Sequence, residues 1–117
     1  MSETGRTYRR PFKGHPIEAA DVRAWTKLRT THPDAPAVAN ELFVAILQSG
    51  ADTVELTIST AGDRLRITAI GSEPLPLRHS HGPGWRLIAG LAQTTGLTTD
   101  ERGLWAQLDT ATNGADA

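Results

Sequence analysis

Residues 53–69 read TVELTISTAGDRLRITA and carry the clearest periodicity in the chain. Apolar and polar side chains alternate on both sides of a short turn. The apolar positions are Val54, Leu56, Ile58, Leu65, Ile67 and Ala69. A period of two is typical of strands that bury one face, and the turn residues Ala61, Gly62 and Asp63 suit a tight connection. The sequence therefore predicts an antiparallel hairpin with one apolar face.

Two helices are expected before this hairpin. From residue 16 to about 30, apolar residues recur at helical spacing, at Ile17, Ala20, Val22, Trp25 and Leu28. A break follows, in which Asp34 is expected to cap the next helix and Pro36 to lie near its first turn. That helix is expected to run to about Ser49, before Gly50. Residues 1–7 are expected to be flexible, and the residues around Phe12 to form a short edge strand.

The C-terminal half is expected to begin with a proline-rich loop over residues 71–83. A third helix is expected from Gly84 to near Gly96, followed by strands at residues 97–99 and 104–108 and a disordered tail over residues 110–117. This order predicts an α+β fold, a two-layer sandwich of one mostly antiparallel sheet with helices on one face. Residues 8–109 are expected to form the single domain.

Composition excludes several classes of function. The chain has 117 residues, 12 Lys and Arg against 13 Asp and Glu, and no cysteine. Its length suits one domain, its formal net charge of −1 argues against direct binding of nucleic acid, and the lack of cysteine excludes disulfides, thiol catalysis and cysteine-ligated metals. No stretch is apolar enough for a membrane span or a signal peptide. We therefore expect a cytoplasmic protein without a membrane partner.

Three stretches, taken in order, resemble one known ATPase domain. They are residues 41–45 (ELFVA), residues 63–67 (DRLRI) and residues 81–88 (HGPGWRLI), followed by a closing hairpin with Trp105 in its last strand. Together they resemble the Bergerat-type domain of the histidine-kinase-like (GHKL) ATPase superfamily, in the form found in anti-sigma-factor serine kinases and their actinobacterial relatives. The resemblance spans roughly residues 8–108.

The resemblance implies a nucleotide site, and two of its functional positions differ here. In the family, a helical Glu acts as general base and an Asn four residues later holds Mg²⁺; this chain has Glu41 but Ala45. A methyl group cannot replace a hard oxygen ligand. The family's adenine-binding Asp corresponds to Gly71, so adenine recognition is absent or falls to Ser72 or Glu73 in a shifted register. Two lost contacts at ~1–3 kcal/mol each predict an affinity shifted from micromolar toward millimolar.

The lid motif of the family survives in part as Gly82 and Gly84, whose backbone amides suit phosphate, while Pro83 between them lacks an amide donor. Trp85 follows and is expected to fill the vacated groove. The degenerate nucleotide groove would thus comprise Gly71, Gly82, Gly84 and Trp85. A plain turn into a helix is the competing interpretation of the glycines.

Other candidate residues have simpler interpretations. His79 and His81 have a metal-ligand spacing but no evident third ligand, so a surface loop is favoured and no metal site is predicted. Trp105 is expected in the core, whereas the roles of Trp25 and Trp85 stay open. A basic cluster of Arg6, Arg9, Arg10 and Lys13 either contacts an acidic partner or nucleic acid or, as we favour, is a solvated strand.

Three functions follow as hypotheses. The first is a non-catalytic regulatory module that binds a protein, which the resemblance implies to be a sigma factor or an anti-sigma antagonist in transcription regulation; it requires no cofactor. The resemblance also suggests a homodimer through the N-terminal strand and first helix. The second is a divergent ATP-dependent serine/threonine protein kinase that uses Glu41 as base with ATP and Mg²⁺. The third is a module that senses a small ligand beside Trp85.

Overall fold

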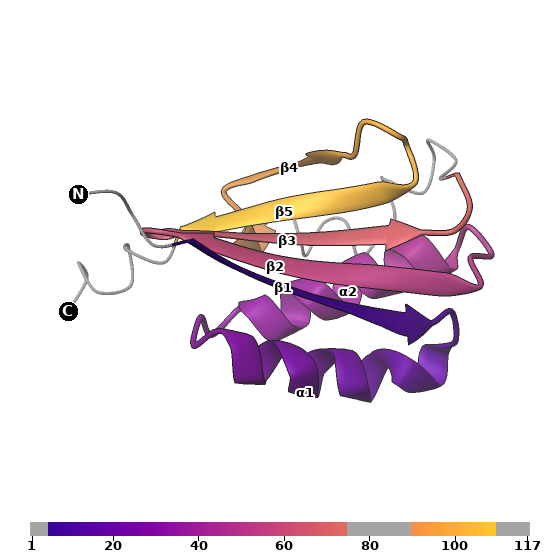
Figure 1. Ribbon diagram of the computed structural model, residues 1–117, viewed down its shortest axis with the longest axis horizontal. Coiled ribbons are helices and arrows are strands. Elements are labelled where there is room, and N and C mark those ends of the chain that lie inside the picture. Colours follow the sequence, from indigo (N-terminus) through magenta and orange to yellow (C-terminus); the bar gives the residue numbers. More distant parts are fainter. Residues whose placement is uncertain (1–4, 75–89, 110–117) are drawn as a thin grey trace.

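The structure, a computed structural model, describes residues 5–74 and 90–109. A five-stranded sheet forms one layer, and two helices lie against one of its faces (Figure 1). In chain order the elements are β1 (Gly5–Lys13), a 3-10 turn (Pro16–Glu18), α1 (Ala19–Arg29), α2 (Ala35–Leu47), β2 (Thr53–Ala61), β3 (Arg64–Gly71), β4 (Thr94–Leu97) and β5 (Gly103–Asp109). The predicted α+β class, with its antiparallel sheet, is confirmed.

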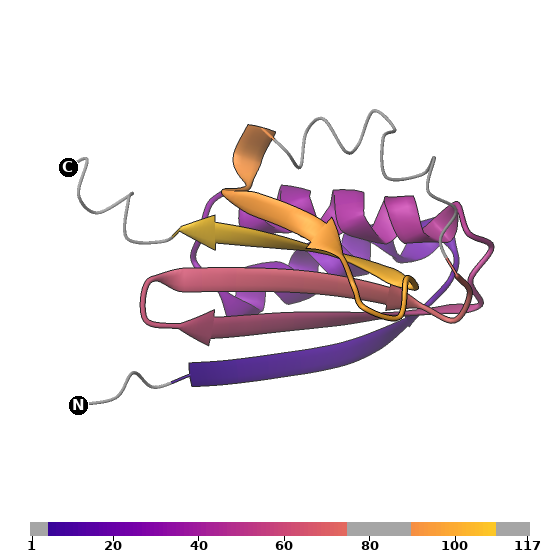
Figure 2. The same cartoon turned by 90° about the horizontal axis from the view of Figure 1, so that it is seen from above.

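The predicted hairpin is the centre of the sheet. Strands β2 and β3 pair antiparallel with Ile58 opposite Ile67, and the turn between them contains Gly62 with a φ of 61°. Glycine adopts this left-handed conformation without steric cost. The sheet order is β1-β2-β3-β5-β4, and every neighbouring pair is antiparallel. Strands β1 and β4 are therefore the two edges (Figure 2).

Both N-terminal helices form close to their predicted bounds, and their starts differ in detail. The first begins as a 3-10 turn, where the His15 side chain accepts a hydrogen bond from the Ile17 N–H. Asp34 occupies the N-cap position of α2, but its side chain makes no capping hydrogen bond. Instead, the Asp34 N–H donates to Nδ1 of His32, a largely buried ring, at 3.1 Å. The side chain of Asp34 is therefore not the cap that the sequence predicts.

The C-terminal boundaries were predicted less well. Residues 90 and 91 are helical, but a helix reaching Gly96 and a strand at residues 97–99 are both wrong, because β4 occupies Thr94–Leu97. Two β-branched threonines favour extended backbone here, and β5 supplies the pairing partner, with Gly96 opposite Trp105. The strand predicted at residues 104–108 is confirmed as β5. At the other end of the chain, β1 already begins at Gly5.

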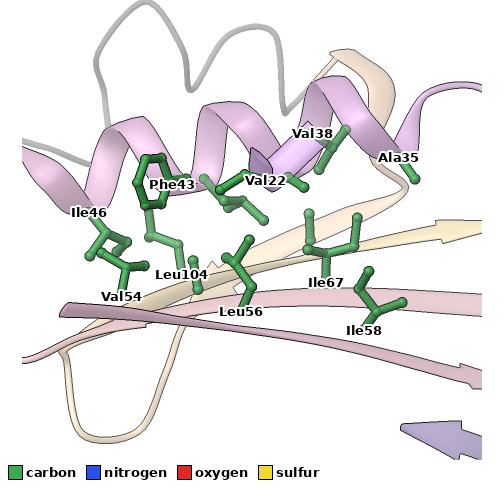
Figure 3. Close-up of a cluster of buried hydrophobic side chains, with 14 of the residues drawn as sticks. Val22, Ala35, Val38, Phe43, Ile46, Val54, Leu56, Ile58, Ile67 and Leu104 are labelled. Carbon is green, nitrogen blue, oxygen red and sulfur yellow. The ribbon is translucent and has the colours of Figure 1, made fainter. Parts of the chain in front are cut away.

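The core lies between the sheet and α2. Side chains of α2 such as Phe43 and Ile46 point toward Leu56, Ile67 and Leu104 of the central strands (Figure 3). Fully buried large side chains include Leu42, Phe43, Ile46, Leu56, Ile58, Leu65, Ile67, Leu104 and Leu108. The alternation in residues 53–69 thus arises because one face of the hairpin is buried. All six apolar positions of the hairpin belong to this core.

The tryptophans separate into two environments. Trp25 on α1 is buried, and its ring meets the Phe12 ring edge-on at 5.9 Å. Trp105 is wrongly predicted as a core residue: it is half-buried and stands on the face of β5 opposite to Leu104 and Ala106, which are buried. Its alternation with these two neighbours places it there, on the face that the described helices leave open. On that face the Arg66 guanidinium lies 4.2 Å from the Trp105 ring centroid.

Candidate functional site

Glu41, the candidate general base, lies on α2 within a short chain of polar contacts. Arg23 Nη1 on α1 donates to Oδ1 of Asn40 at 2.8 Å, and Asn40 Nδ2 donates to Oε2 of Glu41 at 3.3 Å. Glu41 is half-buried. The neighbouring amide therefore holds one carboxylate oxygen, and through it α2 is tied to α1. This hydrogen bond gives Glu41 a structural role that needs no substrate.

Ala45 lies one turn after Glu41 and packs partly against the core. Residues four apart share a helix face, so the two positions have the geometry of the family's base and metal ligand. The methyl group at Ala45 offers no oxygen to a cation. Asn40 lies about 100° from Glu41 around the helix axis, and its side chain is hydrogen-bonded to Arg23 and Glu41. Neither residue therefore offers a free side-chain oxygen at the position that the resemblance assigns to the metal ligand.

Gly71 ends β3 in a buried position where side-chain atoms leave no space for a larger residue. A Cβ at this position would lie 2.6 Å from Cγ2 of Ile46 and 3.0 Å from Cβ of Ala51. The Gly71 N–H donates to the Arg102 carbonyl at 2.9 Å. An aspartate here would clash with the ends of α2 and of the loop that follows it. The position that the resemblance aligns with an adenine-binding aspartate therefore has no space for that side chain.

The two residues that might replace this aspartate differ in their surroundings. Ser72 Oγ accepts a hydrogen bond from the Asp52 N–H at 2.9 Å, and the Ser72 N–H donates to the Thr53 carbonyl at 3.2 Å. Ser72 therefore closes the connection between the start of β2 and the end of β3. Glu73 is exposed. Neither Ser72 nor Glu73 therefore directs a hydrogen-bond acceptor into the interior beside Gly71.

The remaining residues of the predicted groove, Gly82, Gly84 and Trp85, lie outside the described residues, as do His79 and His81. The structure brings the Gly71 position against Ile46, the residue next to Ala45, so positions 45 and 71 of the predicted site lie near each other in space. Within residues 5–74 and 90–109, no group of three or more His, Asp or Glu side chains has a metal-binding arrangement.

A second candidate surface, missed as such from the sequence, lies on α1 and the turn before it. Ile17 and Leu28 are 75% and 79% exposed, and Ala24 between them is exposed too. Ala24 and Leu28, four residues apart, share one face of α1, and Ile17 lies in the 3-10 turn that leads into this helix, while Val22 and Trp25 face the core. The signal was present in the spacing: two apolar stripes with different phases share this helix. An outward stripe is a candidate protein contact.

Among the described helices, none combines the length and the apolar character that a membrane span requires. Searches against protein-family models and against curated proteins find no match to this chain.

Proposed function

We propose that this protein is a non-catalytic regulatory module that binds another protein and has a histidine-kinase-like ATPase fold whose nucleotide site is lost. The observation that carries the proposal is the packing at Gly71, where Ile46 and Ala51 occupy the space of an adenine-binding side chain. An adenine amino group needs a fixed acceptor, and a buried methyl surface offers none. Loss of this contact removes the part of the site that selects the base.

The contacts of α2 support the same proposal. Phosphoryl transfer depends on a metal ion that bridges the phosphates and on a base beside the acceptor hydroxyl. Ala45 has no oxygen, and Glu41 accepts a hydrogen bond from Asn40. Glu41 and Ala45 thus have structural roles in α2, and the proposed activity is binding of a partner at the protein surface.

The exposed apolar residues of α1 fit a protein-binding role. Ile17 and Leu28 leave 75% and 79% of their surface in water in the folded chain, and burial of that surface by a partner would contribute about 25 cal/mol per Å² of apolar area. By its resemblance the chain is expected to bind a sigma factor or an antagonist of one and to act in transcription regulation. Two alternatives are tested against it. Nucleotide binding separates it from a divergent ATP-dependent serine/threonine kinase, and co-purification from the native host, which distinguishes a protein partner from a small ligand, separates it from a small-ligand sensor.

The decisive experiment is a calorimetric titration of the full chain with Mg-ATP and with Mg-ADP up to millimolar concentration. We expect no saturation, since the loss of both the base contact and the metal anchor costs several kcal/mol, or about tenfold in affinity for each 1.4 kcal/mol. Saturable binding well below about 100 µM would overturn the proposal in favour of the kinase.

The protein-binding part is tested on the surface of α1. Leu28→Glu places a charge in the exposed stripe, and we expect it to abolish co-purification of the partner from the native host. Lys27→Glu changes the charge of the adjacent position, which is also exposed, and serves as the matched control. Equal recovery of the partner by both variants would remove α1 from the binding surface.

A further inference from the structure

We propose that the free edge of β1 binds an extended acidic segment of a partner protein, which adds to the sheet as a sixth strand. The inference rests on the proposed protein-binding function and names for it a docking surface and the chemistry of the partner. The unpaired backbone of an edge strand supplies affinity in strand addition, and neighbouring side chains supply specificity.

The first argument is the length and position of the edge. β1 has nine residues and, among the described strands, pairs only with β2 and ends the sheet. No described helix or strand lies beyond it (Figure 2). The opposite edge, β4, has four residues. Natural sheets commonly protect their edges by keeping the edge strand short, and β1 does not follow that rule.

The second argument is the direction of the backbone groups. In an antiparallel pair, residues that exchange hydrogen bonds alternate with residues whose N–H and C=O groups point away from the partner. The Gly14 N–H donates to the Asp52 carbonyl at 2.7 Å, so the even-numbered residues of β1 face β2. Thr7 and Arg9 therefore direct their N–H and C=O groups to the free edge.

Pro11 fits this alternation and limits the docking stretch. It is an odd-numbered position, and its missing N–H falls on the free side, where proline is tolerated in an edge strand. Beyond it, the Lys13 carbonyl accepts a hydrogen bond from the His15 N–H at 2.8 Å. The open ladder thus runs over residues 5–10, with a last free carbonyl at Pro11, which is long enough for a segment of about five or six residues.

The third argument is charge. Arg6, Arg9, Arg10 and Lys13 are four of the chain's 12 basic residues, all are exposed, and β1 contains no acidic residue. Glu55 on the neighbouring strand β2 lies 3.8 Å from Arg9 Nε. From α1, Arg29 adds a guanidinium 5.1 Å from the Tyr8 ring centroid. A strand that carries Asp or Glu complements this edge on both faces of the sheet.

The same charges disfavour a second copy of the chain at this edge. Pairing of β1 with another β1 brings four basic side chains alongside four more, and like charges opposite each other in a sheet are destabilising. A homodimer through the N-terminal strand, which the family resemblance suggests, has to overcome this repulsion. An acidic segment meets no such cost, so it is the occupant that we propose.

The probe for the test is a capped, fluorescein-labelled nine-residue peptide in which pairs of glutamates alternate with pairs of threonines, so that glutamates project on both faces of the added strand. It is titrated with the full chain by fluorescence anisotropy at low salt. We expect saturable binding that weakens at least tenfold when the peptide's glutamates are replaced by lysine, and again when alternate backbone nitrogens are methylated. Binding should also weaken as salt rises, since exposed charges are screened. A peptide that binds as well after methylation would overturn strand addition.

Two pairs of variants locate the site. Thr7→Pro removes an outward N–H without removing a bond to β2, and we expect at least a tenfold loss of peptide affinity, whereas Thr7→Val keeps the N–H and the affinity. Arg9→Glu should reduce affinity at least tenfold, and Lys27→Glu, the same charge change on α1, should leave it within twofold. Circular dichroism melting establishes that each variant is folded. Equal binding by Thr7→Pro and Thr7→Val would overturn the proposal.

Sedimentation of the chain without peptide tests the competing occupant. A dimer that Thr7→Pro converts to a monomer assigns the edge to a second copy and overturns the proposal; a species unchanged by Thr7→Pro supports it. These outcomes are independent of the nucleotide titration. Tight Mg-ATP binding would overturn the proposed function and leave the peptide result unaffected. If the peptide does not bind, the β1 edge is excluded as the docking site, whereas α1 remains a candidate protein-binding surface.

Discussion

The two faces of the sheet show how differently one set of strands can be used. On the face covered by α2, Leu56, Ile67 and Leu104 are fully buried against helix side chains. On the opposite face, Trp105 is half-buried between Gly96 on β4 and the guanidinium of Arg66 on β3. The stability of the covered face depends on close packing of buried side chains. That of the open face depends on the contacts of one ring, Trp105 on β5, with residues of β4 and β3. Mutations should therefore cost most on the covered face.

The largest effect is expected for Phe43→Ala. Phe43 is the largest fully buried side chain of the core, and its ring meets the Phe12 ring edge-on with centroids 6.2 Å apart. Truncation of a buried phenylalanine typically costs about 3–5 kcal/mol, because the transfer free energy is lost and a cavity remains. Urea unfolding followed by circular dichroism measures this change in the free energy of unfolding.

Trp105→Ala is the matched comparison on the open face. Its larger ring is partly exposed in the native state, so less surface returns to water on truncation, and we expect a smaller loss than for Phe43→Ala. If both substitutions cost the same, the two faces do not differ in the way proposed.

The second effect concerns Gly71, at the end of the covered face. Gly71→Ala is expected to cost about 1–3 kcal/mol, because its Cβ enters the space of Ile46 and Ala51. Gly71→Asp is expected to cost more, since it also buries a carboxylate, and to leave Mg-ATP binding unimproved in calorimetry. In an Ile46→Ala background the added cost of Gly71→Ala should fall, because the methyl 2.6 Å away is gone. Efficient ATP binding by Gly71→Asp would contradict the filled site.

Much of the fold was predictable because burial leaves a local record in the sequence. Residues 53–69 alternate along two strands, so the hairpin, its turn and its buried face followed directly. The same rule would have placed Trp105 correctly, since it alternates with Leu104 and Ala106. Strand β4 left no such record: Thr94–Leu97 is short, contains glycine and becomes a strand through its pairing with β5.

The candidate site was predictable only in part. The sequence shows that position 71 carries no side chain, but it does not show that Ile46 and Ala51, 25 and 20 residues earlier, pack against it. That contact depends on how α2 lies across the sheet. The exposure of Ile17 and Leu28 depends on tertiary structure in the same way, because only the packing of α1 decides which of its two apolar stripes faces the core.

The third effect is a displacement of the Trp105 ring on the open face. A Cβ at Gly96 would lie 2.7 Å from Cζ2 of Trp105, so Gly96→Ala must displace the indole. Because this face is open, the ring can move outward, and we expect a cost of about 1 kcal/mol, at the low end for overpacking. Displacement should shift the Trp105 indole N–H resonance, and Trp105→Phe identifies that resonance. An unshifted resonance would show that the ring does not lie on Gly96.

The fourth effect isolates the contact between Arg66 and Trp105. A double-mutant cycle with Arg66→Ala and Trp105→Ala should give a coupling of about 0.5–1 kcal/mol, as expected for an exposed cation over an aromatic ring. Arg66 Nη2 also donates to Oε1 of Gln107 at 3.3 Å, so a parallel cycle of Arg66→Ala with Gln107→Ala separates that hydrogen bond. Zero coupling in the first cycle would mean that the ring contributes only its area.

The smallest effect lies in the loop between β4 and β5, beyond both faces, and it is lost in acid. The Thr98 hydroxyl and the Arg102 N–H both donate to Oδ1 of Asp100, and these hydrogen bonds, the first above all, hold the pKa of Asp100 below its usual range. A carboxylate with a lowered native pKa stabilises the fold at pH values above its unfolded pKa, and this contribution is lost as pH falls through the native value. The difference in unfolding free energy between the wild type and Asp100→Asn should therefore be constant from pH 7 to about 5 and shrink below about 4. Thr98→Val removes the stronger donor and should reduce the same pH dependence. Urea unfolding at each pH measures both, and a difference that stays constant to pH 3 would show that this loop does not hold the charge of Asp100.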